Sequence, residues 1–203
     1  MKGAMDFYDK TAPDWARRGY ESDDVPCLLD FVRRLAPGSR ILELCCGCGY
    51  DARRMHALGY EVAGVDFSAE SLKIARAKNP DIAFYNDNIL NDYSYVGPVD
   101  AIVVIAGLVH IETAQLPLAF RRMRDVLKPG GSLFVTVREG EGRMEERSVA
   151  VIDGETYDRN FIGHTLEELT ASSAGLFEFE REVADDGTGW RNYIFTGVPG
   201  ERE

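Results

Sequence analysis

Residues 41–52 read ILELCCGCGYDA. The first four form a short apolar run that is typical of a buried strand, and a helical pattern begins at Asp51. Between them, Gly47 and Gly49 allow a tight turn and let a ligand approach the backbone, because glycine has no Cβ. The amide groups that open the following helix can bind an anion. This segment therefore predicts a strand, a ligand-binding loop and a helix, as in α/β sheets that bind ligands beyond the carboxyl ends of their strands.

Strand and helix patterns alternate over the next part of the chain. Further strands are expected at 61–65, 82–85, 99–105 and 132–137, and helices at 26–35, 51–58, 68–78 and 113–127. A short helix, interrupted near Pro13, is expected at 5–18. This alternation indicates βαβ units and a parallel sheet with helices on both faces.

The C-terminal part of the chain has a different pattern. A helix is expected at 165–174, with Thr165 and Glu168 forming a capping box. Two β-rich runs follow at 176–183 and 190–198, and the turn sequence DDG at 185–187 lies between them. We therefore expect an antiparallel hairpin at the edge of the sheet.

Length and composition restrict the class of protein. The chain has 203 residues, of which 45% are apolar, so we expect a single domain over 1–203 with a full hydrophobic core. Its 34 acidic and 23 basic side chains give a net charge of −11, which opposes binding to a phosphate backbone, so no nucleic-acid partner is expected. No apolar run is long enough to cross a membrane and no signal peptide is recognisable. We therefore expect a cytoplasmic protein without a membrane partner.

The four cysteines do not suggest disulfides or a metal. Cys45, Cys46 and Cys48 are too crowded for disulfides with one another, and free thiols fit a reducing compartment. Structural zinc needs four ligands that converge tetrahedrally, which adjacent cysteines seldom do. We expect thiols that pack in the core and no metal.

Acidic residues follow two further predicted strands. Asp66 ends the second strand, 17 residues after Gly49, where a carboxylate can accept hydrogen bonds from both ribose hydroxyls of a nucleoside. Asp87 follows the third strand and can bind an exocyclic amine, while the amide of Asn88 can address a ring nitrogen. These groups favour a nucleoside ligand.

Two cofactors fit a glycine loop followed by an acid. Gly47-x-Gly49-x-x-Ala52 satisfies the nicotinamide-dinucleotide fingerprint. However, the carboxylate of Glu43 would repel a pyrophosphate, Asp87 would have no task, and 203 residues leave little room for a substrate domain. A carboxylate at Glu43 suits a ligand with an ammonium group. The ligand that these acids describe is an adenosine joined to a cationic amino acid, S-adenosylmethionine.

At these residues the sequence resembles the class I S-adenosylmethionine-dependent methyltransferases. The resemblance covers roughly 8–198 and rests on ILELCCGCG at 41–49, GVDFS at 64–68, NDNI at 86–89, LVHI at 108–111 and LKPGG at 127–131. It implies an α/β fold with one Rossmann-like, doubly wound sheet of seven strands, mostly parallel with a C-terminal antiparallel hairpin, and helices on both faces.

The resemblance also implies roles for the motif residues. Around the methionine part of the cofactor it places Glu43, Cys45, Cys46, Gly47, Gly49 and Ala106. It places Asp66 on the ribose, Phe67 against the adenine, and Asp87, Asn88 and Ile89 at the adenine edge. Cys45 stands where the family usually has a glycine, so its side chain must point away from the cofactor or the loop must shift.

The methyl acceptor is expected to be a small molecule. DNA amine methyltransferases carry an Asn/Asp-Pro-Pro-aromatic tetrapeptide after the fourth strand, whereas this chain has IAGL at 105–108. His110 follows the fourth strand and is the candidate general base, with helix capping or packing as the alternative.

Two segments are expected to surround the acceptor. Residues 1–36 would form a helical lid and residues 139–164 an insert over the acceptor site. The candidate substrate-binding residues are Tyr8, Trp15, Arg138 and Tyr157. Arg138, Arg143 and Arg159 would either meet an acidic substrate or carry solvated charges.

The sequence thus predicts an S-adenosylmethionine-dependent methyltransferase with a small-molecule acceptor. The alternatives are an NAD(P)-binding Rossmann oxidoreductase and a non-catalytic protein that binds S-adenosylmethionine.

Overall fold

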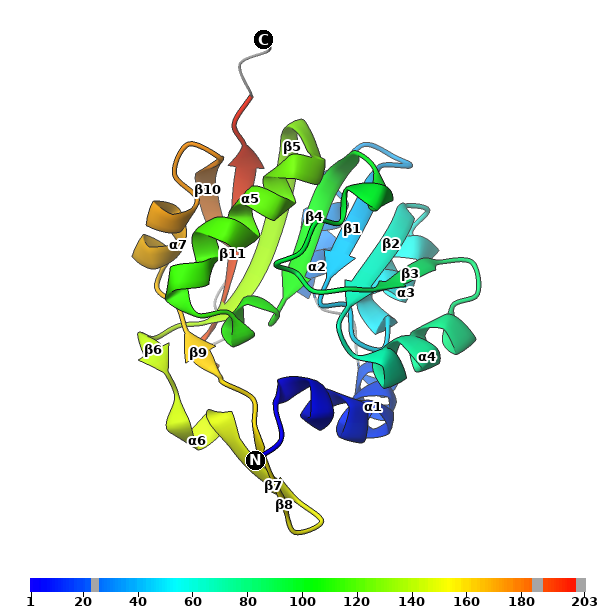
Figure 1. Ribbon diagram of the computed structural model, residues 1–203. Coiled ribbons are helices and arrows are strands. Elements are labelled where there is room, and N and C mark those ends of the chain that lie inside the picture. The colour runs from blue at the N-terminus through cyan, green and yellow to red at the C-terminus, as the bar shows by residue number, and fades with distance from the viewer. Residues whose placement is uncertain (23–25, 184–187, 200–203) are drawn as a thin grey trace.

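A computed structural model of the chain describes residues 1–22, 26–183 and 188–199. Its centre is a seven-stranded sheet with the order β10-β11-β5-β4-β1-β2-β3 (Figure 1). The strands are β1 (Arg40–Leu44), β2 (Glu61–Asp66), β3 (Ala83–Asn86), β4 (Val99–Ile105), β5 (Leu127–Arg138), β10 (Phe177–Val183) and β11 (Trp190–Gly197). β11 runs antiparallel to both β5 and β10, and the other neighbours are parallel. The predicted fold class is confirmed.

The strand order reverses at β1. From β1 the chain adds β2 and β3 on one side, and then returns to add β4 and β5 on the other. At such a reversal the loops that leave β1 and β4 separate, and ligands of open α/β sheets bind in the resulting crevice. The loop at 45–49 follows β1, so it stands at this crevice.

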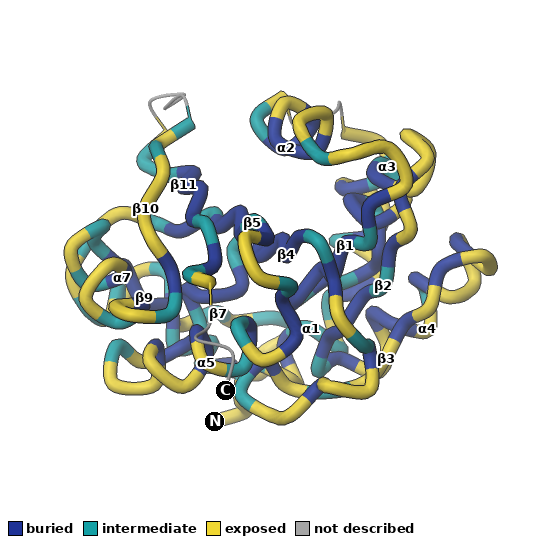
Figure 2. Tube along the Cα trace, turned by 90° about the horizontal axis from the view of Figure 1, so that it is seen from above, coloured by how far each residue is buried: buried dark blue, intermediate teal, exposed yellow. Residues whose placement is uncertain are grey.

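Helices cover both faces of the sheet, as Figure 2 shows. On one face lie α2 (Pro26–Val32), α3 (Tyr50–Ala57) and α4 (Ala69–Lys78), whose apolar side chains pack on Ile41, Val103 and Phe134. On the other lie α5 (Leu116–Val126) and α7 (Leu166–Ser172). Because successive strand residues point to opposite faces, one strand contributes to both layers of the core.

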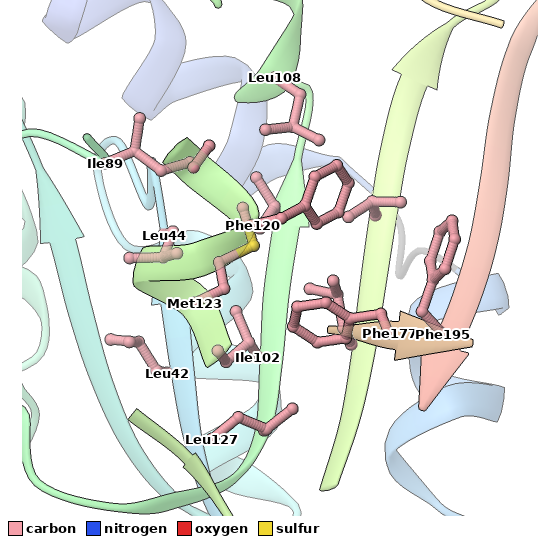
Figure 3. Close-up of a cluster of buried hydrophobic side chains, with 14 of the residues drawn as sticks. Leu42, Leu44, Ile89, Ile102, Leu108, Phe120, Met123, Leu127, Phe177 and Phe195 are labelled. Atoms are coloured by element: carbon pink, nitrogen blue, oxygen red, sulfur yellow. The ribbon is translucent and has the colours of Figure 1, made fainter. Parts of the chain in front are cut away.

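The larger core cluster lies between the sheet and α5 (Figure 3). Leu42 and Leu44 of β1 point into it, and Phe120 of α5 is fully buried there. The Phe120 ring lies 5.8 Å from that of Phe177 and 6.2 Å from that of Phe195, so α5 also holds the antiparallel strands. Burial of one such ring contributes about 1.5–3 kcal/mol.

The first helix, α1 (Ala4–Glu21), lies across the sheet edge at which the parallel strands end (Figure 1). The expected interruption at Pro13 is wrong, because the helix runs through this residue. Ala12 and Ala16 on its inner face pack against Cys48, and this contact favours one continuous helix. Asp9 accepts a hydrogen bond from Ser68 Oγ at 2.6 Å, which fastens α1 to the start of α4.

Residues 139–164 form a separate small structure beside α1 (Figure 1). It contains β6 (Gly142–Arg143), α6 (Glu145–Ser148), β7 (Val149–Ile152), β8 (Glu155–Asp158) and β9 (Ile162–Gly163). β7 pairs with β8, and β6 pairs with β9. The amide of Lys2 donates to the carbonyl of Thr156, so the chain just before α1 is joined to this insert.

Some local predictions are confirmed and others need correction. Ser68 caps α4, and Thr165 with Glu168 forms the capping box of α7. Helix α5 ends at Val126, one residue before the predicted end, but the strand expected at 132–137 begins earlier, because β5 starts at Leu127. The DDG turn at 185–187 lies outside the described residues. Among the helices that are described, none is long and apolar enough to span a membrane.

Gly49 and Gly59 both have positive φ, but only Gly49 is closely packed, so their alanine variants distinguish the cost of backbone strain from the cost of a steric clash. Gly49 (φ +76°) has Phe84 Cζ 2.8 Å from the position of an added Cβ, whereas Gly59 (φ +90°) has nothing within 4 Å. We expect Gly59→Ala to lower the free energy of unfolding by about 1–2 kcal/mol through strain alone. Gly49→Ala should cost about 1–3 kcal/mol more, because the core must also yield. Urea unfolding measures both, and equal losses would contradict the packing argument.

Candidate active site

The cavity that joins the ends of the motif strands, here called the main cavity, lies under α1, at the carboxyl ends of β1, β2 and β4. Its volume is about 130 Å³. Most of its lining side chains are aromatic or small, and the lining residues are Tyr8, Trp15, Cys45, Gly47, Cys48, Tyr50, Asp66, Phe67, Ser71, Ile105, Ala106, Gly107 and His110. The loop after β1, the end of β2, the loop after β4 and the N-terminal helix therefore converge on one space.

A second cavity of about 210 Å³ adjoins the main cavity. It is lined by Ala4, Met5, Cys45, Phe67, Asn88, Ile89, Gly107, His110 and Ile111. Four residues line both spaces: Cys45, Phe67, Gly107 and His110. These four side chains and backbones form the partition between the two cavities.

Asp66 joins the loop after β1 to the loop after β2. Its Oδ2 accepts a hydrogen bond from the amide of Gly47 at 2.8 Å, and its Oδ1 accepts one from the amide of Ser68 at 2.8 Å. The carboxyl is buried, which raises its pKa, while the two amide bonds pull the pKa down. Each oxygen keeps a lone pair for a ligand, because a carboxylate oxygen accepts more than one hydrogen bond.

Two loop residues that the sequence assigned to the cofactor lie outside both cavity linings. The thiol of Cys46 is buried in the core behind the sheet, and its amide donates to the carbonyl of Val65 at 3.2 Å. Gly49 adopts the left-handed conformation as N-cap of α3 and packs against Phe84. Here the glycine is required by close packing within the protein, whereas Gly47, with open space around its Cα, lines the main cavity.

Cys45 occupies a backbone position that favours glycine. Its φ is +57°, in the left-handed region that L residues seldom adopt. The side chain points at Gly107, where an added Cβ would stand 2.7 Å from Cys45 Sγ. Burial raises the pKa of the thiol, so it is neutral at pH 7. A thiol at this position narrows the passage between the two cavities.

Glu43 is a buried carboxyl with one unpartnered oxygen. It is 3% exposed, it lies beneath the loop after β1, and its Oε2 has no hydrogen-bond partner. Burial, together with the nearby carboxyls of Asp51 and Asp66, raises its pKa well above the ordinary value. It does not line either cavity. A cation bound at the loop would relieve this unfavourable environment.

The residues after β3, which were all predicted to bind the adenine edge, differ in where they lie. Asn88 and Ile89 line the second cavity, as expected for a nucleobase edge. The Asp87 carboxylate instead accepts hydrogen bonds from Asn91 Nδ2 at 2.7 Å and Tyr95 Oη at 2.9 Å, and Asp87 does not line either cavity. The structure thus gives Asp87 a part in holding its own loop.

His110 follows β4 in a short 3-10 turn, η2 (Leu108–His110), and lines both cavities. Its Nε2 lies 2.8 Å from the hydroxyl of Tyr8, and its Nδ1 lies 2.9 Å from the carbonyl oxygen of Arg159. Burial, opposed by the hydrogen bond to this carbonyl, lowers the pKa of His110 to about 4. The imidazole is therefore neutral at pH 7. Ala106, in the same loop, also lines the main cavity and has φ +54°.

The predicted substrate residues separate into two pairs. Tyr8 and Trp15, both on α1, line the main cavity. Arg138 and Tyr157 do not line either cavity: the Arg138 guanidinium donates to the carbonyl of Thr188, and the Tyr157 hydroxyl donates to Glu155 Oε2 at 2.8 Å. Tyr157 is buried and its ring packs 6.0 Å from that of Phe7, so it supports α1 from behind.

The two remaining candidate arginines are not among the lining residues of either cavity, although the Arg159 guanidinium lies close to Tyr8. Arg143 pairs with Asp158 at 2.9 Å and with Glu145 at 2.7 Å. The Arg159 guanidinium stacks 4.6 Å over the ring of Phe7 and donates to the carbonyl of Arg147. An acidic substrate therefore finds no cationic side chain among the lining residues.

Sequence reasoning missed several residues that line the main cavity. They are Tyr50, Ser71, Ile105 and Gly107. Tyr50 opens α3 directly after the glycine loop, and Gly107 follows Ala106, so adjacency to a predicted residue was the available signal. The part of the chain that the structure describes contains no group of three or more histidine, cysteine or acidic residues able to hold a metal ion.

Comparison with known proteins agrees with this geometry. Residues 41–131 match a family described as "Methyltransferase domain". A ubiquinone biosynthesis O-methyltransferase of Xanthomonas campestris pv. campestris (strain B100) is 32% identical over 119 residues, which are 55% of this chain and 48% of that protein. A demethylmenaquinone methyltransferase of Renibacterium salmoninarum is 31% identical over 99 residues, or 49% of this chain and 41% of that protein. The chain spans about half the length of these curated relatives or less.

Among solved structures, the DhpI–SAH complex superimposes with a TM-score of 0.79 over 98% of this chain and 96% of that chain, at 21% identity. This likeness concerns the fold. The domain match and the relatives support an S-adenosylmethionine-dependent methyltransferase, with the match to the methyltransferase domain over residues 41–131, and the solved structure shows that the fold extends over nearly the whole chain.

Removing the buried carboxyl of Glu43 should make the protein more stable and weaken its binding of the cofactor. Because its pKa in the folded protein is raised above the unfolded value, stability falls as the pH rises from about 4.5 toward the folded pKa. At pH 8, Glu43→Gln should therefore raise the free energy of unfolding by about 1 kcal/mol. It should also weaken binding of S-adenosylmethionine, whose ammonium group favours a carboxylate. Thermal unfolding and calorimetry measure the two effects, with exposed Glu178→Gln as the control. A lower melting temperature for Glu43→Gln would contradict the argument.

The conformation of Cys45 predicts a gain or no loss on substitution by glycine. Cys45→Gly removes strain of about 1 kcal/mol, offset by a similar chain-entropy cost, and it widens the passage between the cavities. S-adenosylhomocysteine should bind as tightly or more tightly in calorimetry. Cys45→Val, a β-branched residue at positive φ, should bind at least about tenfold more weakly. A large loss of affinity in Cys45→Gly would show that the thiol itself contacts the ligand.

Proposed function

We propose that the protein transfers a methyl group from S-adenosylmethionine to a hydroxyl group of a small, uncharged, ring-containing molecule. The observation that carries this proposal is the convergence of the Gly47 loop, Asp66 and a neutral His110 on one aromatic cavity. The domain match over residues 41–131 supports methyl transfer over the alternative of an NAD(P)-dependent oxidoreductase.

The residues present fit the cofactor. We assign the methionine part to the loop at 45–47 and Ala106, the ribose to Asp66, and the adenine to Phe67, Asn88 and Ile89 in the second cavity. The unpartnered Oε2 of Glu43, beneath the loop, supplies negative charge for an ammonium group. The cofactor would then bridge the two cavities past the partition at Cys45.

The lining of the main cavity limits the acceptor. Tyr8, Trp15, Tyr50 and Phe67 present aromatic rings, and no lysine or arginine is among the described lining residues of either cavity. This lining suits an uncharged planar ring and gives no support to the acidic acceptor considered from the sequence. The relatives named for ubiquinone and menaquinone biosynthesis are in keeping with a ring-containing acceptor.

The cofactor supplies an activated methyl group on a sulfonium, which an acceptor displaces in line. The protein's task is then to align the acceptor, exclude water and take up a proton. We propose that α1 is the lid that excludes water, since its Tyr8 and Trp15 lie over the main cavity. The insert at 139–164 supports this lid, because the Tyr157 ring packs on Phe7 and the carbonyl of Thr156 accepts a hydrogen bond from the amide of Lys2. We propose that the whole chain acts as one domain. The four free thiols fit action in the cytoplasm.

Calorimetry with three ligands tests the cofactor assignment. S-adenosylmethionine and S-adenosylhomocysteine should bind and NADH should not. Binding of NADH alone would overturn the proposal. A screen of uncharged phenols for release of S-adenosylhomocysteine then tests the acceptor class.

Asp66 gives the corresponding residue-level prediction. Asp66→Ala should weaken S-adenosylhomocysteine by about 1.5–3 kcal/mol, roughly 10- to 150-fold, because hydrogen bonds to a charged group are lost. Since Asp66 also holds the amides of Gly47 and Ser68, circular dichroism must show that the variant is folded, and Asp66→Asn serves as a milder change. Exposed Asp81→Ala is the control. Unchanged affinity in folded Asp66→Ala would remove Asp66 from the site.

A further inference from the structure

The hydrogen bonds of His110 fix which of its nitrogens carries the proton. Nδ1 lies 2.9 Å from the carbonyl oxygen of Arg159, and a carbonyl oxygen only accepts. Nδ1 therefore donates, and in the neutral ring Nε2 is left as the acceptor. The Tyr8 hydroxyl, 2.8 Å from Nε2, must then donate to it. The only basic atom of His110 is already covered by Tyr8.

We propose that Tyr8, and not His110, contacts the acceptor hydroxyl, and that Tyr8 takes the acceptor's proton while passing its own to Nε2 of His110. In this arrangement Tyr8 is the catalytic residue, and His110 acts through it. The Arg159 carbonyl is a positioning group that holds the imidazole in the tautomer able to receive the proton. This inference rests on the proposed function and deepens it by naming the residue that takes the proton of the acceptor hydroxyl.

The proton transfer balances the charge of the reaction. The S–CH₃ bond breaks and the O–CH₃ bond forms, so the positive charge of the sulfonium disappears. The acceptor O–H bond breaks, its proton moves to Tyr8 Oη, and the former Tyr8 proton forms the second N–H bond of His110. One positive charge thus moves from sulfur to imidazole, and the net charge of the site is unchanged. A buried site favours such a transfer, because creating an additional charge there would be costly.

The acidities of the two groups fix the order of events. Burial raises the pKa of Tyr8 to about 12, although the neighbouring Arg159 guanidinium lowers it, and the pKa of His110 is lowered to about 4. Neither group ionises before reaction at pH 7. A base this weak cannot remove the proton of a free phenol, but it accepts the proton as the new O–C bond makes the acceptor oxygen strongly acidic. The imidazolium then loses its proton to water.

Three separate parts of the chain build this arrangement. α1 supplies Tyr8, η2 supplies His110, and the insert supplies the Arg159 carbonyl. The insert holds that carbonyl rigidly, because the Arg159 amide donates to Ser148 at 2.7 Å and its guanidinium stacks on Phe7. The titratable and charged groups around the pair are Arg159 from the insert, and Cys45 and Asp66 from the strand ends.

The tautomer can be measured without turnover. In protein labelled with ¹⁵N-histidine, His110 should be neutral with the proton on Nδ1 from pH 6 to pH 8. Tyr8→Phe should shift the Nε2 resonance, because the donated hydrogen bond is lost. Tyr20→Phe is the matched control, since the hydroxyl of this α1 tyrosine donates to the backbone carbonyl of Cys48 and accepts from Asn79 Nδ2, with no contact to His110 among its described hydrogen bonds. A proton on Nε2, or an Nε2 resonance unaffected by Tyr8→Phe, would overturn the proposal.

Turnover separates a proton path through Tyr8 from two simpler roles. With catechol, hydroquinone and 2-naphthol as acceptors, Tyr8→Phe and His110→Ala should each lower kcat by about 10²–10³-fold. The double variant should be no slower than the slower single variant, because the two residues act as a unit. Affinity for S-adenosylhomocysteine should stay within about twofold in all variants. Tyr20→Phe should keep full kcat.

Each other outcome counts against the proposal. Full activity in Tyr8→Phe would make His110 a direct base, and a loss of S-adenosylhomocysteine affinity with unchanged kcat would make the pair a structural contact. The wild-type rate should stay constant from pH 8 to pH 6 and fall only toward the His110 pKa of about 4, and a midpoint near 6.5 would contradict the buried pair. If no phenol is methylated although S-adenosylhomocysteine binds, this inference fails and the cofactor assignment stands. If neither cofactor form binds, the proposed function fails first.

Discussion

The carboxylate of Asp66 is the interaction on which the arrangement of the site depends. One oxygen holds the amide of Gly47 and the other holds the amide of Ser68, so the loop after β1 and the start of α4 are fixed to one side chain. Ser68 in turn donates to Asp9 of α1, and α1 carries Tyr8 to the imidazole of His110. A single buried acid thereby connects the glycine loop, the N-terminal helix and the proposed proton acceptor. The same acid is the one that we assign to the ribose.

Buried negative charge has a cost in this protein that a cationic ligand offsets. Glu43 and Asp66 lie close together in a chain of net charge −11, and burial raises the pKa of both. Asp51 is also buried, but Arg54 balances it at 2.7 Å. No such partner reaches Oε2 of Glu43. The free energy of unfolding of the ligand-free protein is therefore lower than the packing of the core alone would give. A cation bound at the loop would recover part of this difference, so the buried acids favour a cationic ligand.

Features set by backbone periodicity were predictable from the sequence. The buried runs, the caps at Ser68 and Thr165, and the strand ends at Asp66 and 99–105 follow from local patterns, and together they imply the sheet and the edge that carries the site. The directions in which individual side chains point could not be predicted from these local patterns. Asp87 satisfies the same motif whether its carboxylate faces a ligand or Asn91, and only the folded loop decides between the two.

Long-range packing accounts for the remaining differences. The family resemblance assigned Cys46 and Gly49 to the ligand, yet the Cys46 thiol packs in the core and Gly49 accommodates Phe84 from a distant strand. The conformation of Cys45, by contrast, explains why the family usually has glycine at this position, because φ is +57° there. Contacts between segments more than 30 residues apart cannot be read from periodicity. For that reason the sequence did not indicate that Arg138 and Tyr157 lie outside both cavity linings.

The neutral histidine and the cationic cofactor are two parts of one electrostatic constraint. An imidazolium beside a sulfonium would place two positive charges in a buried site, and binding would then compete with protonation. Burial and the neighbouring Arg159 guanidinium hold the pKa of His110 near 4, so the imidazole adds no positive charge to the site when the cofactor binds. After methyl transfer the cofactor product has lost its sulfonium charge, and the same imidazole can carry a proton that it could not hold before. The low pKa of His110 thus serves binding first and proton release afterwards, and both follow from the packing of α1 and the insert around one ring.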